Sequence, residues 1–377
     1  MPDCNRLLQA AERLHEHLNR AFLKESLLEG PDAGVRFNLR AWRFLKSALN
    51  AIPWRDHYIF MQTQGYWVLA NWMLHDLTGK QPYQELALQA AEAILKLQTP
   101  EGSWRYPLPE RKHLIATVEG NWGATGLLAT YLRMGERQFL EAALRWHRFL
   151  IERIGFQPHG PGEAVNYFDR PRGKVPNNSV ETAWFFLRLR KVTGDERYLA
   201  HVAEMLQFLA DVQRPTGELP YVIESPFERG REHYLCFQYN AFQLMKLAWS
   251  AEMDSTGGAR KLLPPLAAFL EKGVTPSGAS AADCFHALPE VDYYTAALGA
   301  ALHEASRLGV SEKAKTLSER CYARVLARQR SDGRFAYSEK DYGFLRDSRS
   351  YPRPEAMTLF HLLLPCVGRE SRSLFSA

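Results

Sequence analysis

A short phrase of sequence recurs along the chain at nearly equal intervals. The pattern Gln-x-x-x-Gly-x-apolar begins at Gln98, Gln213 and Gln329, so that successive copies are 115 and 116 residues apart. These spacings correspond to two periods of about 58 residues. Weaker copies lie between them, at Ile154-Gly155 and at 272–278. A unit repeated throughout a chain of 377 residues predicts a repeat architecture.

Glycines that follow apolar runs divide each repeat into two helices. They are Gly79, Gly135, Gly194, Gly257 and Gly309. Glycine just after a helix readily adopts the left-handed conformation that ends it, so we expect tight helical hairpins. The first helix of a hairpin is nearly uncharged, which requires cover on all sides. The second helix is amphipathic.

This pattern predicts an all-α fold, a closed (α/α)6 toroid with six inner and six outer helices in one domain over residues 1–377. Closure covers the inner helices on every side, whereas an open solenoid exposes its ends. The expected inner helices cover residues 61–78, 121–134, 177–192, 238–254, 291–308 and 353–366. The expected outer helices cover residues 4–28, 81–98, 136–153, 195–213, 259–273 and 311–329.

The composition excludes several classes of protein. The net charge of +5 is spread without a run of Lys or Arg, so we expect no nucleic-acid partner. No apolar stretch suits a membrane span, and the N-terminal residues contain no apolar signal segment. The five cysteines include no Cys-x-x-Cys pair, which indicates free thiols in a reducing compartment. The sequence therefore predicts a cytoplasmic protein.

We expect no cofactor and no metal. The sequence contains no glycine-rich phosphate loop. Asp283-Cys284-Phe285-His286 is a weak zinc pattern, because no second closely spaced ligand pair accompanies it. A buried cysteine beside a surface histidine explains the same residues.

Long connections precede the inner helices, all on one face of the toroid. They cover residues 99–120, 156–176, 214–237, 275–290 and 331–352. Loops of this length in a compact fold are usually functional. We therefore predict the site where these loops meet the N-terminal ends of the inner helices.

Polar and aromatic residues gather at these helix starts. We predict catalytic roles for Glu119, His233, Tyr239, His57 and Asp292. We predict substrate-binding roles for Tyr58, Gln64, Asn121, Trp122, Asn177, Asn178, Tyr234, Asn240, Tyr293, Arg349 and Arg353.

Each of these residues also has a structural alternative. Asn, Asp and Ser before a helix commonly cap it. Asn178-Ser179-Val180-Glu181 resembles a capping box, and Asp292 fits an ordinary cap. Trp122 suits a core position as well as a stacking position.

The residue types indicate a sugar-binding cleft. Amides and carboxylates bind hydroxyl groups, aromatic rings stack on sugar faces, and Arg pairs with uronate. Lyase or C5-epimerase chemistry would use a Tyr or His base, with Arg, Asn or Gln neutralising the substrate carboxylate. Hydrolysis would use two carboxylates, Glu119 with Asp292, Asp283 or Glu290. Both mechanisms remain open at this point.

The recurring phrase resembles the QW repeat of terpenoid cyclases and protein prenyltransferases. The acidic Asp-x-Asp-Asp motif of the cyclases is absent from the chain. Residues 118–130, 164–168 and 175–179 resemble toroid proteins encoded in bacterial exopolysaccharide clusters. This second resemblance implies a polysaccharide context and assigns no catalytic residue.

Three functional hypotheses follow. The first is an enzyme acting on an acidic, uronic-acid-type glycan or its precursor, with the exopolysaccharide synthesis machinery as partner. The second is a terpenoid-cyclase-like or prenyltransferase-like enzyme, which requires an apolar cavity. The third is a glycan-binding subunit without catalytic activity.

Overall fold

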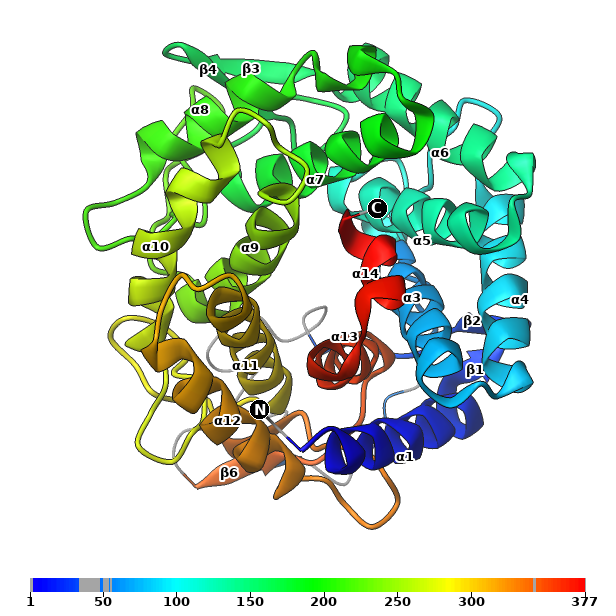
Figure 1. Cartoon of the computed structure of the whole chain (residues 1–377), viewed down its shortest axis with the longest axis vertical. Coiled ribbons are helices and arrows are strands. Elements are labelled where there is room, and N and C mark those ends of the chain that lie inside the picture. The colour runs from blue at the N-terminus through cyan, green and yellow to red at the C-terminus, as the bar shows by residue number, and fades with distance from the viewer. Residues whose placement is uncertain (1–2, 34–47, 50–53, 55, 342–343, 377) are drawn as a thin grey trace.

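The computed structural model describes residues 3–33, 48–49, 54, 56–341 and 344–376. Within these ranges the helices form two concentric rings (Figure 1). The inner ring consists of α3 (Met61–Thr78), α5 (Thr117–Met134), α7 (Pro176–Thr193), α9 (Cys236–Ser250), α11 (Asp292–Arg307) and α13 (Pro352–Leu363). The outer ring consists of α1 (Cys4–Phe22), α4 (Gln81–Leu97), α6 (Arg137–Phe149), α8 (Val202–Val212), α10 (Gly258–Glu271) and α12 (Lys313–Leu326).

The predicted (α/α)6 toroid is confirmed. Helix α13 packs against both α11 and α3, which closes the inner ring. Helix α1 packs on α13 and completes the outer ring from the other end of the chain (Figure 1). No helix in the described part of the chain has the length and apolar character needed to cross a membrane.

Some element boundaries differ from the prediction. The first helix ends at Phe22, because Glu25 and Ser26 adopt positive φ angles of 46° and 72° and turn the chain into a hairpin of β1 (Leu23–Lys24) and β2 (Leu27–Leu28). The outer helix expected over 195–213 is divided into the short 3₁₀ helix η3 (Glu196–Leu199) and α8. Two further hairpins lie in the long connections. They are β3 (Phe156–His159) with β4 (Gly162–Val165), and β5 (Ser338–Asp341) with β6 (Leu345–Asp347).

The glycine hairpins form largely as predicted. Gly79, Gly135 and Gly194 end α3, α5 and α7 with φ angles of 67°, 73° and 73°. Gly257 also has a positive φ, but it stands at the N-terminal cap of α10 because α9 already ends at Ser250.

The recurring phrase ties three of the outer helices, α4, α8 and α12, each to the next outer helix. The side-chain Nε2 of Gln98 donates hydrogen bonds to the carbonyl oxygens of Gly102 (3.0 Å) and of Ala142 on α6 (2.9 Å). The same two-armed contact recurs at Gln213 with Gly217 and Leu262, and at Gln329 with Gly333 and Ala10. The phrase therefore has a structural role. We call each glutamine with its two hydrogen bonds a staple, and the last copy joins α12 to α1.

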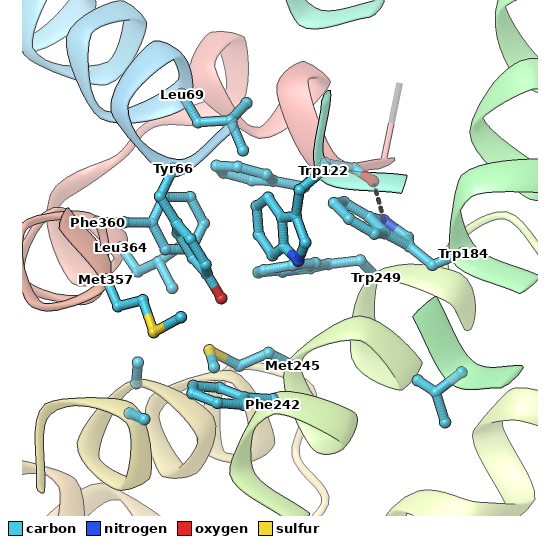
Figure 2. Close-up of a cluster of buried hydrophobic side chains, with 14 of the residues drawn as sticks. Tyr66, Leu69, Trp122, Trp184, Phe242, Met245, Trp249, Met357, Phe360 and Leu364 are labelled. Atoms are coloured by element: carbon cyan, nitrogen blue, oxygen red, sulfur yellow. Dashed lines mark hydrogen bonds between the residues drawn. The ribbon is translucent and has the colours of Figure 1, made fainter. Parts of the chain in front are cut away.

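The centre of the barrel is filled with aromatic side chains (Figure 2). Tyr66 stacks on Trp122 with ring centres 3.8 Å apart, and both are 1% exposed. The C-terminal helix α14 (Arg369–Ser376) packs against this cluster. Its Phe375 stacks on Trp249 at 4.9 Å, and the backbone carbonyl oxygen of Phe375 accepts a hydrogen bond from the indole of Trp184.

Helix α14 covers the end of the barrel where the inner helices finish. Ser371 donates to Asp76 near the end of α3, and Arg372 pairs with Glu304 near the end of α11. The opposite end, where the inner helices begin, is left to the long connections. The candidate site is therefore sought at that end.

Candidate functional site

Five tyrosines line the end of the barrel where the long connections meet the inner helices. Burial raises the pKa of all five phenols, yet each side chain keeps part of its surface accessible. Groups that are surrounded by protein and still accessible line a concave surface. We call this set the tyrosine ring; it consists of Tyr106, Tyr167, Tyr239, Tyr293 and Tyr337.

The phenols of the tyrosine ring influence one another electrostatically. Tyr239 lies within reach of both Tyr167 and Tyr293, and Tyr293 lies 6.1 Å from Tyr337 between ring centres. Tyr167 is in turn within reach of Tyr106. Residues from five separate parts of the chain are thus near one another at this end of the barrel.

Arg353, in the first turn of α13, stands within this ring. Its guanidinium forms two hydrogen bonds with the carboxylate of Asp32, at 2.7 and 2.8 Å, and lies 4.4 Å from the ring centre of Phe60. Its positive charge opposes the burial-driven rise in the pKa of Tyr167 and Tyr293. The predicted substrate-binding arginine therefore lies beside the phenols, although Asp32 already holds one edge of it.

Glu119 lies within electrostatic reach of Tyr106 and Tyr167 and is 1% exposed. Its Oε2 accepts a hydrogen bond from the backbone N–H of Gln62 at 3.1 Å, so the side chain caps the start of α3 from the neighbouring helix α5. Burial raises its pKa to about 7, against the lowering effects of this hydrogen bond and of Arg353. The predicted catalytic carboxylate is thus placed as a support for the site.

Two of the predicted amides stand at the start of α7 with unused hydrogen-bonding atoms. Asn177 is half-buried, and its Oδ1 has no hydrogen-bond partner. Asn178 is buried, and its Nδ2 has none either. Gln238 on α9 repeats the pattern with an unpaired Oε1. These atoms are themselves buried, so they leave hydrogen-bonding capacity unused inside the protein beside the start of the inner helices.

Three other predicted amides have structural roles instead. Gln64 and Asn240 each exchange a pair of hydrogen bonds with the backbone of an incoming segment, at Leu28 and Leu219 respectively. Asn121 bonds the side chains of Trp146 and Thr182. All three side chains are buried and engaged, so the structure removes them from the candidate site.

The predicted stacking residue Trp122 belongs to the core, because Tyr66 covers its face and only 1% of its surface is exposed. His57 is exposed and pairs with Glu29 at 2.8 Å, outside the tyrosine ring. Arg349 bonds Asp347 and the carbonyl oxygen of Leu49.

The remaining predicted residues lie closer to the ring. Asp292 lines a small cavity together with Tyr293 and Glu355. Tyr234 contacts Tyr239, with 6.3 Å between ring centres. Tyr58 pairs its backbone with Gly30 and its ring with Phe60 at 6.3 Å. His233 contacts the buried carboxylate of Glu218 at 2.8 Å.

The capping alternative is wrong for α7 and α11. Helix α7 begins at Pro176, so Glu181 lies inside it and pairs with Lys246 at 2.8 Å in the barrel centre. Asp292 is the first residue of α11, and the N-cap position of that helix is occupied by Val291. At the start of α3, the backbone N–H of Gln62 donates a hydrogen bond to the carboxylate of Glu119, which belongs to the next inner helix, α5.

The spacing of the recurring phrase also bears on the tyrosine ring. Tyr106 and Tyr337 each follow a recurring glutamine by eight residues, and Tyr221 does so after Gln213. Tyr221 packs against Tyr239 at 4.8 Å. The staple therefore also sets the position of one tyrosine in three of the long connections.

No protein-family model matches the sequence. No curated protein resembles it at a significant level either. Solved structures do resemble it in fold. One is described as a polysaccharide lyase, with 12% identity, 96% of each chain covered and a TM-score of 0.68.

Two further solved structures with this fold carry other descriptions. An α-1,6-mannanase from Salegentibacter shares 12% identity over 96% of this chain and 99% of its own, with a TM-score of 0.70. A type II terpene cyclase from Scytonema shares 15% identity over 96% and 98%, with a TM-score of 0.62. At these identities the likeness establishes the toroid fold, and function must be argued from the site.

Proposed function

We propose that the protein is a carbohydrate-active enzyme that processes an acidic glycan, or a precursor of one, at the tyrosine ring. The observation that carries this proposal is the position of Arg353 among partly accessible phenols, with Tyr167 and Tyr293 within electrostatic reach. A guanidinium binds carboxylates in a fixed geometry, and phenols donate to sugar oxygens. The fold shared with a polysaccharide lyase and a mannanase supports the same class of substrate.

The site favours proton transfer next to a substrate carboxylate. Burial keeps the phenols protonated at neutral pH, while Arg353 works against that effect at Tyr167 and Tyr293. A uronate carboxylate held at Arg353 would have its charge neutralised, which eases removal of the adjacent proton. The accepting group must be a phenolate, so we assign that role to Tyr167 or Tyr293 after it has released its own proton to solvent, a step that the charge of Arg353 favours. We assign the donating role to Tyr239, which stays protonated.

Lyase or epimerase chemistry is therefore the form of the proposal that we prefer to hydrolysis. Hydrolysis needs a pair of carboxyl groups facing each other across the sugar. Glu119, the carboxylate that we expected in that role, is buried and bonded to the start of α3. The exopolysaccharide context and a synthesis-machinery partner rest on the resemblance of residues 118–130, 164–168 and 175–179 and are part of the proposal.

The experiment is an activity and binding screen with oligosaccharides in matched uronate and neutral forms. Elimination is followed by the ultraviolet absorbance of the unsaturated product, and epimerisation by proton exchange with deuterated water. Tyr239→Phe, Tyr167→Phe and Arg353→Lys should each reduce turnover at least tenfold, whereas His57→Ala on the outer surface should not. Unchanged turnover in all three site variants would contradict the catalytic proposal, and binding without turnover would leave a glycan-binding subunit.

One observation favours the terpenoid-cyclase alternative. The barrel centre carries Tyr66, Trp122, Trp184 and Trp249, an aromatic content suited to an apolar substrate (Figure 2). These side chains pack closely together, and Phe375 of α14 is buried among them. Turnover of a polyprenyl substrate, with no binding of any uronate, would establish this alternative.

A further inference from the structure

Potential metal ligands from two neighbouring connections converge beside the start of α9. A carboxylate oxygen of Glu218, a ring nitrogen of His233 and the sulfur of Cys284 lie within 4.8 Å of one another. Cys236, the first residue of α9, adds a second sulfur 3.3 Å from that of Cys284. Soft thiolates together with imidazole and a carboxylate are the ligand types that zinc prefers.

The separations among the ligand atoms of Glu218, His233 and Cys284 suit one shared ion. Nδ1 of His233 lies 2.8 Å from Oε2 of Glu218, and the sulfur of Cys284 lies 3.8 Å from the same oxygen. Tetrahedral zinc with bonds of about 2.0–2.3 Å places neighbouring ligand atoms roughly 3.3–3.8 Å apart. The observed distances fall within about half an ångström of that range. The two sulfurs are also well beyond the S–S bond length of about 2.05 Å.

Hydrogen bonds within the protein leave this cluster incompletely satisfied. The side chain of Glu218 is 1% exposed, and its Oε1 has no hydrogen-bond partner. Nδ1 of His233 is buried and also lacks a directed hydrogen bond, although Oε2 of Glu218 is nearby. An incompletely paired buried carboxylate is costly, and a cation among these groups would remove that cost.

The backbone segments that carry these ligands are each held in place by their own contacts or conformation. Leu235, between His233 and Cys236, has a φ of 44°, a left-handed conformation that a leucine adopts only under constraint. Glu218 follows Gly217, whose carbonyl oxygen is held by the staple residue Gln213 at 3.1 Å. Ligand positions that are fixed by their own segments are a feature of preorganised metal sites.

We propose that Glu218, His233 and Cys284 bind one zinc ion. The sulfur of Cys236 lies 3.3 Å from that of Cys284 but outside this group of three, so its side chain must shift to reach the ion as the fourth ligand of a tetrahedral, structural site. The ion would join the connection before α9 to the connection before α11. It would also hold Tyr234, which neighbours His233, in its place against Tyr239.

This proposal revises our expectation from the sequence that there is no metal site. His286 of the weak zinc pattern pairs with Asp283 at 2.9 Å and does not belong to the cluster. The pattern therefore supplies only Cys284, while the other ligands come from residues 48 to 66 positions earlier. Sequence spacing could not reveal ligands that meet only when the toroid closes two connections against each other.

The test is the metal content of the full chain, purified with a reductant and dialysed against buffer containing zinc sulfate and then against metal-free buffer. We expect about one zinc per chain, as for a closed four-ligand site. Replacement by Co²⁺ should give the thiolate-to-cobalt absorption of a tetrahedral two-sulfur site. Cys284→Ser and His233→Ala should lose the metal, while His286→Ala in the same connection should retain it.

Circular dichroism of each variant separates loss of the ligand from loss of the fold. Zinc bound equally by the wild type, Cys284→Ser and Cys236→Ser would overturn the proposal. So would a wild type that binds no zinc and yields a Cys236–Cys284 disulfide in peptide mapping without reductant. Because the measurement is metal content, its outcome is independent of the glycan proposal.

Discussion

Arg353 of α13 and Asp32 of the segment before α3 form a two-bonded ion pair at the tyrosine ring, with N–O distances of 2.7 and 2.8 Å. The carboxylate side chain is 1% exposed while the guanidinium side chain is 28% exposed. The pair therefore has a buried end that stabilises the fold and an accessible end that can meet a ligand. The same ion pair therefore contributes both to the stability of this end of the barrel and to the charge that a ligand would meet there.

Breaking this pair from the arginine side should destabilise the protein. Arg353→Met leaves the carboxylate of Asp32 buried without its partner, a change that typically costs about 3–5 kcal/mol. Asp32→Asn in the same chain should recover part of that loss, because an amide needs no counter-charge. Urea unfolding of both single variants and the double variant measures the coupling. The exposed pair Arg190–Glu196 is the control, where Arg190→Met should cost less than about 1 kcal/mol. Additive losses at Arg353 and Asp32 would contradict the buried pairing.

Glu119 should make stability depend on pH. Its pKa is about 7 in the folded protein against an ordinary value of 4.5, so the folded state holds its proton more tightly than the unfolded state. The stabilisation by protonation is present below pH 4.5 and is lost as the pH rises toward 7, by roughly 3 kcal/mol in total. Glu119→Gln cannot lose that proton, so its free energy of unfolding should fall less over this range.

The comparison is made by urea unfolding at pH 4.5, 6 and 8. Glu85→Gln, at an exposed position on α4, is the control and should follow the wild-type profile. A Glu119→Gln profile that parallels the wild type at all three pH values would show that Glu119 does not titrate in this way.

Substitution by alanine should have different effects at Gly102, which lies in a copy of the recurring phrase, and at Gly135, which ends α5. Gly102 has a φ of 97°, and a Cβ there would lie 2.7 Å from the carbonyl oxygen of Arg145 on α6. Gly135 has a φ of 73°, but nothing lies within 4 Å of the added Cβ. Gly135→Ala should therefore cost only the left-handed conformation, about 1 kcal/mol. Gly102→Ala should cost roughly 1–3 kcal/mol more, because the backbone of α6 must move. Equal losses in thermal unfolding would mean that the staple tolerates displacement.

The architecture was predictable because the same local chemistry recurs in the chain. Glycines such as Gly135 end the helices where expected, and the glutamine phrase keeps a constant spacing because each copy makes the same contact. The inner helices were recognisable from their lack of charge. Closure was predictable from the number of repeats, since each hairpin needs a neighbour on both sides.

The residues of the site were less predictable, because the direction in which each side chain points decides whether it faces the site or the core. Asn121 and Asn177 both stand near helix starts, yet one bonds a core indole and the other keeps an unpaired oxygen. A polar residue one position further along a helix turns by about 100°, which changes the space that it faces. The buried pair of Glu181 and Lys246 was missed for the same reason, because nothing in either segment shows that the two side chains meet.

The C-terminal helix should stabilise the barrel from the end opposite the site. Phe375 is fully buried, stacks on Trp249 and meets Phe360 edge-on at 5.5 Å. Phe375→Ala should destabilise the protein by about 3–5 kcal/mol, the usual cost of removing a buried aromatic side chain.

Intrinsic fluorescence should change with this substitution, because the indoles of Trp184 and Trp249 lose their apolar cover. Phe227→Ala is the matched control, since Phe227 is 58% exposed and should cost less than about 0.5 kcal/mol. Turnover or ligand binding at the tyrosine ring should survive Phe375→Ala below its unfolding temperature. Loss of binding in a variant that remains folded would show that the aromatic barrel centre, and not the tyrosine ring, holds the substrate.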